Sequence, residues 1–158
     1  MKRWPAAFAM MSLGCSAYGF ADRPGVGVTK ELVPVRTVDV DASSGADAGY
    51  LTRELVAHLQ RNGLAGASWT TSQTRGAVAC DVAVREEAFG EHVRVVAAAR
   101  CAVDGEIVAT RSGDAQLALA ATTRMTDRAQ AAEIAANRAL EAAATEIAAH
   151  LTTEEARP

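Results

Sequence analysis

The 158-residue chain is poor in aromatic side chains, in excess positive charge and in long apolar runs. Aromatic residues make up 4% of the sequence although hydrophobic residues make up 49%, so most apolar side chains are small and each buries little area. The net charge of −3 disfavours a protein that binds nucleic acid through its phosphates. No run reaches the roughly 20 apolar residues that cross a bilayer. The length allows one domain with a core.

The N-terminal residues have the pattern of an export signal. Lys2 and Arg3 precede a short apolar run at 4–13, as in a secretory signal peptide. The sequence Leu13-Gly14-Cys15 is similar to the end of a lipobox, in which the cysteine is lipidated and becomes the first mature residue. We therefore predict a signal peptide at 1–14 with Cys15 as the lipidation site.

A second processing site leaves the mature N-terminus open. Gly19 and Ala21 fit an ordinary signal peptidase cut before Asp22, which predicts a soluble periplasmic protein instead. In the lipoprotein interpretation Ser16 follows the lipidated cysteine, and the absence of Asp at that position favours the outer membrane. Residues 15–31 then form a tether to the folded domain. A cytosolic chain without processing is the remaining alternative.

The rest of the sequence alternates between strand and helix patterns. We expect one domain over residues 32–151 and a polar tail at 152–158. Helices are expected at 46–61 and 127–151. Strands are expected at 32–40, with an irregularity in the alternation at Arg36-Thr37, and in a meander at 77–89, 93–103 and 106–111. Short extended segments are expected at 67–71 and, after a break at Gly113-Asp114, at 115–122. The order predicts an α+β fold of β-α-β-β-β-α type. Two helices pack on one face of a mostly antiparallel four-stranded sheet.

A tight turn predicts how two of the three cysteines are placed. Gly90-Glu91 has the chemistry of a type II′ hairpin turn, and Asp104-Gly105 that of a type I′ turn. The first turn sets Cys80 opposite Cys101 at a non-hydrogen-bonded pair, where Cα atoms lie about 4.5 Å apart. That separation suits a disulfide, which an exported protein can keep. Two buried unpaired thiols, or a metal or redox site, are the alternatives.

Catalytic patterns are missing from the sequence. His58, His92 and His150 lie far apart and have no metal-ligand spacing, and we expect His58 to be a surface or boundary residue. The adjacent Glu86 and Glu87 point to opposite faces of a strand and therefore do not form an acid–base pair. We predict that the protein is not an enzyme and holds no metal or cofactor.

Several segments together resemble a known family. Cys15 is followed by Tyr18 and Phe20. Four later segments follow in order: a strand at 35–40, a helix with the pattern Leu-Thr-x-x-Leu at 51–55, a second strand at 77–84 and a closing helix at 129–151. This pattern is similar to LptE-type lipopolysaccharide-assembly lipoproteins. The resemblance implies a lipid-anchored periplasmic plug inside the outer-membrane barrel LptD, which assists lipopolysaccharide transport to the cell surface.

The resemblance also suggests where lipopolysaccharide binds. Family members are said to contact it through basic residues near loops, and arginine pairs bidentately with phosphate. Arg75, Arg94 and Arg111 are therefore candidate lipopolysaccharide contacts. Two other functions stay open: a small exported lipoprotein that binds and regulates a periplasmic cell-wall enzyme, and a periplasmic lipid carrier.

Overall fold

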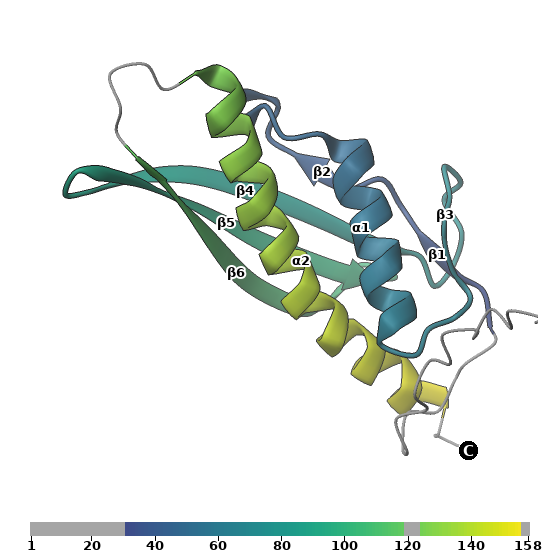
Figure 1. Ribbon diagram of the computed structural model, residues 1–158. Helices are drawn as coiled ribbons and strands as arrows, with labels where there is room; N and C mark the ends of the chain where they lie inside the picture. The colour runs from purple at the N-terminus through teal and green to yellow at the C-terminus, as the bar shows by residue number, and fades with distance from the viewer. Residues whose placement is uncertain (1–30, 119–123, 156–158) are drawn as a thin grey trace, which may run out of the picture.

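The computed structural model describes residues 31–118 and 124–155 as one sheet with two α-helices, shown in Figure 1. The elements are β1 (Val33–Val35), β2 (Asp39–Val40), the 3-10 turn η1 (Ala42–Ser44), α1 (Ala48–Arg61), β3 (Ala67–Trp69), β4 (Val78–Phe89), β5 (His92–Val103), β6 (Glu106–Ala118) and α2 (Met125–Glu155). The α+β class predicted from the sequence is confirmed.

The sheet is mixed, not mostly antiparallel and four-stranded as the sequence suggested. It has six strands in the order β3-β1-β4-β5-β6, with β2 pairing on β4. β1 runs parallel to β3 and to β4, and β2 runs parallel to β4. For β1 and β3 the reason is the connection through α1, because a helix between two strands returns the chain to the sheet in the same direction. β4 follows β3 through a loop and runs in that direction too.

The first predicted strand is divided in two. Residues 36–38 interrupt it between β1 and β2. At this break the backbone N–H of Val38 donates to Oγ1 of Thr52 on α1, at 2.9 Å, and the Arg36 N–H donates to the Val78 carbonyl. The irregularity expected at Arg36-Thr37 is thus real, and a helix side chain replaces the missing ladder partner.

Helix α1 has sequence-encoded ends. Asp47 caps its first turn, where its Oδ1 accepts a hydrogen bond from the Tyr50 N–H at 2.9 Å. Hydrogen bonds from the Tyr50 and Gly49 N–H groups lower the pKa of Asp47 below 3.8. Since these bonds favour the ionised carboxylate, the cap stabilises α1 at neutral pH and is lost as the pH falls through that lowered pKa. Asn62 and Gly63 end the helix where the sequence predicted.

The two hairpin turns have the predicted backbone conformations. Gly90 has φ of +60° whereas Glu91 is not left-handed, which matches type II′. Asp104 and Gly105 have φ of +50° and +85°, which matches type I′. The register that the first turn sets is confirmed, because Cys80 lies opposite Cys101.

Strand β6 continues through Gly113, where the sequence predicted a break at Gly113-Asp114. Gly113 pairs with Ala97 on β5, and α2 crosses the strand directly above it. A Cβ atom at this position would lie 2.7 Å from the Ala139 backbone nitrogen and 2.7 Å from the Arg138 Cβ. Glycine is therefore present because the helix backbone comes close to the strand, not because the strand ends.

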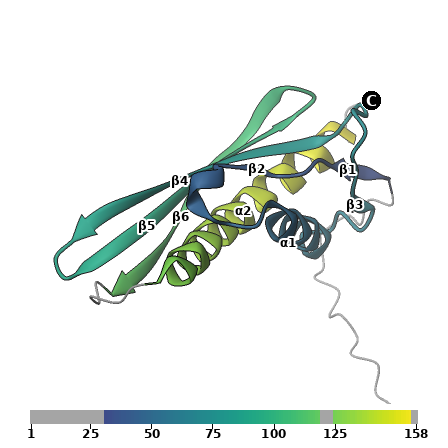
Figure 2. The same cartoon turned by 90° about the horizontal axis from the view of Figure 1, so that it is seen from above.

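The core lies between the sheet and the two helices, which cover the same face (Figure 2). α2 is longer than the predicted 127–151 and includes residues 152–155 of the predicted polar tail. Its buried side is mostly alanine, together with Leu140 and Ile147 (Ala131, Ala132, Ala135, Ala136, Ala139, Ala143, Ala144 and Ala148). Small side chains let this helix pack close to β5 and β6, which fits the low aromatic content.

Candidate functional site

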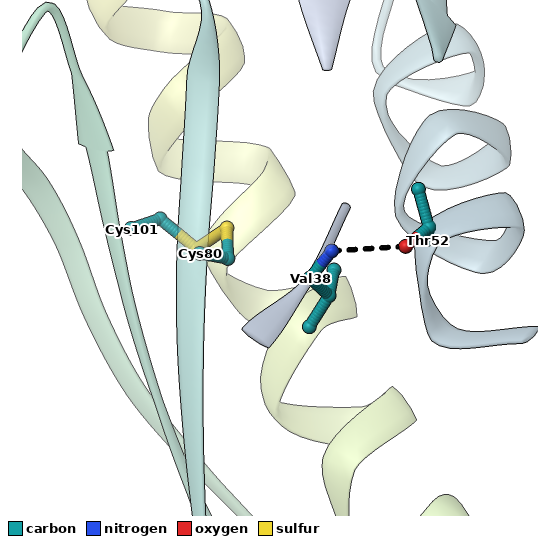
Figure 3. The surroundings of a disulfide bond; sticks show 4 residues. All are labelled: Val38, Thr52, Cys80 and Cys101. Atoms are coloured by element: carbon teal, nitrogen blue, oxygen red, sulfur yellow. Dashed lines mark hydrogen bonds between the residues drawn. A yellow bond between two sulfur atoms is a disulfide. The ribbon is translucent and has the colours of Figure 1, made fainter. Parts of the chain in front are cut away.

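The cysteine pair forms a disulfide in the core. The S–S bond between Cys80 and Cys101 is 2.04 Å long and the Cα atoms are 4.1 Å apart. Figure 3 shows the bond joining β4 to β5 on the side that faces α2. The two residues are 2% and 0% exposed. A buried disulfide between adjacent strands of one sheet is a structural link, and a redox partner has no access to it.

Removing this disulfide lowers stability only moderately. The double variant Cys80→Ala, Cys101→Ala is expected to lose less than about 3 kcal/mol of unfolding free energy, since the hairpin already holds the two strands together. Urea denaturation monitored by circular dichroism measures the loss. Reductant should destabilise the wild-type protein and leave the double variant unchanged. If both cysteines of the folded wild-type protein react with iodoacetamide before reduction, the assignment fails.

The three candidate arginines do not converge. Arg75 lies in the turn between β3 and β4, whereas Arg94 lies close to the β4–β5 turn at the other end of the sheet. Arg111 is on β6 and binds Glu146 of α2, so its side chain lies on the helix side. The side chain of Arg94 pairs instead with Asp114, at 3.4 Å. The structure therefore offers no common phosphate site for the three. Cys15 lies outside the described residues.

Neither of the two described helices covers the face of β4, β5 and β6 that points away from them, here called the outer face. Figure 2 shows both helices on the opposite side of the sheet. A row of small residues crosses the outer face, because Ala83 lies opposite Ala98 and Ala98 opposite Ser112. This row forms the floor of a shallow groove of about 280 Å³, with Arg85 and Arg94 at its rim.

The charges on the outer face are balanced. Three acids and three arginines lie there (Asp81, Glu87, Asp114, Arg85, Arg94 and Arg100). The register places Asp81 opposite Arg100, and Glu87 pairs with Arg85 at 2.9 Å and not with its partner in the register, Arg94. A face without net charge suits a mixed polar protein surface better than a cluster of phosphates.

A second groove of about 300 Å³ lies on the helix side, between η1, the start of α2 and the sheet. Val84, Val95 and Ala132 line its apolar part. Arg128 and Glu86 lie beside it with their charged atoms 3.9 Å apart. The groove opens to solvent, and its polar groups do not converge on one point.

His58 is buried between the two helices, so the expectation of a surface or boundary histidine was wrong. It is 3% exposed, its Nε2 lies 2.8 Å from Asn137 Oδ1, and Arg61 donates to its Nδ1 at 2.6 Å. Since Arg61 can only donate, Nε2 carries the proton and donates to Asn137. The spacing from Leu51 and Leu55 places His58 on the buried helix face, and this signal was available in the sequence.

Neither metal-binding nor membrane-spanning features occur in the described part of the chain. Residues 31–118 and 124–155 contain no group of three or more metal-ligating side chains. No helix within these ranges is long and apolar enough to cross a membrane.

Comparison with known proteins gives distant structural similarity only. The chain matches no protein-family model and no curated protein. Among solved structures it is similar to the PelC dodecamer from Paraburkholderia phytofirmans, with 11% identity, coverage of 77% of this chain and 87% of that chain, and a TM-score of 0.44. It is also similar to a minor lipoprotein from Acinetobacter baumannii (13% identity, 77% and 94% coverage, TM-score 0.37).

A third similar structure is the rare lipoprotein B from Shewanella oneidensis, with 12% identity, 77% and 96% coverage and a TM-score of 0.34. Two of these three structures thus carry the name lipoprotein, and they do not single out the lipopolysaccharide-assembly family. At these identities and scores no function transfers from them to this chain.

Proposed function

We propose that the protein is a lipid-anchored periplasmic assembly factor without catalysis. In this proposal Cys15 holds it on the outer membrane, and its outer face docks against the outer-membrane barrel LptD to assist lipopolysaccharide transport. The lipobox-like Leu13-Gly14-Cys15 supports the anchor. The Cys80–Cys101 disulfide fits the oxidising periplasm.

The uncovered outer face is the observation that carries the docking part of the proposal. Its long strands extend past the helices at the β4–β5 turn (Figure 2), and its central row is made of the exposed small residues Ala83, Ala98 and Ser112. A flat row of small side chains lets the backbone of a partner approach closely. Balanced charges around the row offer hydrogen bonds and ion pairs to a mixed partner surface.

The anchor is tested by membrane fractionation. Cys15→Ala is expected to move the protein from the membrane fraction to the soluble fraction or to leave it as an unprocessed precursor, because the acyl chains supply the membrane affinity. Ser16→Ala is the matched control and should stay membrane-bound in its processed form. A Cys15→Ala protein that is processed and fractionates like the wild type contradicts lipidation.

Docking is tested by affinity purification from outer membranes. The wild-type chain should recover LptD, and Ala98→Arg should recover at least about tenfold less, because the long side chain fills the row of small residues. Ala149→Arg introduces the same side chain at an exposed position on α2 and should recover LptD normally. Recovery of LptD that is equal with Ala98→Arg shows that the outer face is not the contact.

The same purification separates the alternative functions. If LptD is absent from the wild-type eluate and surface lipopolysaccharide stays normal after depletion, the lipopolysaccharide-assembly role is excluded. Recovery of a cell-wall enzyme would then support the regulator. The two open grooves of about 300 Å³ and 280 Å³ give the lipid carrier little support, since ligand sites usually enclose most of their ligand.

A further inference from the structure

Two large apolar side chains are exposed at the β3–β1 edge of the sheet. Leu32 is 82% exposed and Trp69 is 60% exposed. The strands pair in parallel with Val33 opposite Ala67 and Val35 opposite Trp69. Leu32 therefore lies about 10 Å from Trp69 along the strand direction. Leu32 directly precedes β1 and Trp69 ends β3, and these two strands form one edge of the sheet (Figure 1), here called the corner.

The indole of Trp69 is held in place by a hydrogen bond within the protein. Its Nε1–H donates to Oγ1 of Thr37 at 3.1 Å. The polar atom of the ring therefore has a partner while much of the side chain remains exposed. Transfer of the exposed ring surface into an apolar medium would leave this N–H satisfied, which removes the main cost of burying a tryptophan.

The chain enters the folded domain at this same corner. Glu31 lies against Gly66, and the Val33 N–H donates to the Gly66 carbonyl at 3.1 Å. Only 15 residues lie between Cys15 and Glu31 in the sequence, a span of at most about 55 Å when fully extended. A lipid on Cys15 would thus tether the domain by the corner that carries Leu32 and Trp69.

Two arginines lie in the chain segments that follow β1 and β3. Arg36 directly follows the strand partner of Trp69, and Arg75 lies in the turn that leads from β3 to β4. Both are exposed, and within residues 31–118 and 124–155 no ion pair joins either one to an acid. Anionic phospholipid surfaces attract arginine side chains of this kind.

We propose that the corner formed by Leu32, Trp69, Arg36 and Arg75 contacts the surface of an anionic phospholipid bilayer. The inference rests on the proposed anchor at Cys15, and it adds a second membrane contact beside the acyl chains. The tryptophan ring inserts at the headgroup level while the arginines pair with lipid phosphates.

Tryptophan fluorescence tests this contact at one residue. The sequence has two tryptophans, so Trp4→Phe leaves Trp69 as the sole reporter whichever processing site is used. The full chain is purified from membranes, weighed by mass spectrometry to detect acylation of Cys15, and mixed with phosphatidylglycerol vesicles that carry brominated acyl chains. Trp69 emission should shift to the blue in unbrominated vesicles and be quenched in the brominated ones.

The matched control places the only indole elsewhere. In Trp4→Phe, Trp69→Phe, Ile134→Trp the reporter sits on α2, where residue 134 is 43% exposed, and it should escape quenching. Arg36→Gln with Arg75→Gln should weaken binding to phosphatidylglycerol vesicles by about tenfold or more and leave the weaker binding to phosphatidylcholine vesicles unchanged.

The contact and the anchor can fail separately. An acylated chain whose Trp69 is quenched no more than the indole at position 134 overturns the proposed contact and leaves the anchor standing. A chain without acylation whose Trp69 is quenched overturns the anchor and supports the contact. Emission that is already blue-shifted without vesicles and does not change with them shows that another part of the protein covers Trp69, which also overturns the contact.

Discussion

Gly113→Ala is expected to lower the free energy of unfolding by about 3 kcal/mol, at the upper end of the usual cost of overpacking. The added methyl group would lie 2.7 Å from the Ala139 backbone nitrogen and 2.7 Å from the Arg138 Cβ. These atoms belong to the body of α2 and cannot rotate away. The helix must therefore move off β6, which loosens the alanine-lined contact along the sheet. Urea denaturation measures the loss.

Gly49→Ala is the matched control for this substitution. A Cβ atom at Gly49 would have as its nearest neighbours the side-chain atoms Asp47 Oδ1 at 3.1 Å and Arg53 Nη1 at 3.7 Å, of which at least the arginine can move. Alanine is also the better helix former by up to about 1 kcal/mol. The control variant should therefore be neutral or more stable. Equal effects of the two substitutions would show that α2 does not press on Gly113.

Leu140→Ala is expected to cost about 2–5 kcal/mol, in the range of large-to-small substitutions in cores. Leu140 is fully buried on α2. Within the described length of α2, Leu140 and Ile147 are the fully buried side chains larger than alanine. The neighbouring alanines are too short to fill the space that the substitution leaves, so we expect a loss in the upper half of the range.

Glu141→Ala is the control for the core variant. Glu141 follows Leu140 in the same helix turn, but its side chain is exposed. This substitution should change the unfolding free energy by no more than about 0.5 kcal/mol. A Leu140→Ala loss below 1 kcal/mol would mean that the helix shifts to fill the cavity, contrary to the close contact at Gly113.

Part of the candidate site could be read from short-range patterns. The Gly90-Glu91 turn predicted the pairing of Cys80 with Cys101, because a two-residue turn fixes the register of both strands. The turn could not predict that the side chain of Arg94 pairs with Asp114 and not with Glu87. That choice depends on β6, a third strand whose side chains compete for the same arginine.

Other features depend on contacts between residues far apart in the chain. The burial of His58 requires Asn137 on α2, 79 residues away. The ion pair of Arg111 requires Glu146 on α2, 35 residues away. Local propensity does not report such partners, and the three candidate arginines consequently looked equivalent in the sequence although they lie in three different environments.

The sequence by itself determined the α+β class, the two hairpin turns and the register that joins Cys80 to Cys101. Each of these depends on side chains within a few residues of one another, where turn and helix preferences act directly. Only the tertiary structure decided that β1 and β3 run parallel and that β6 continues through Gly113. The tertiary structure also decided that both helices pack on one face of the sheet, so that neither of them covers the outer face. These outcomes depend on where α1 and α2 pack, and that is settled by the burial of the whole apolar surface at once.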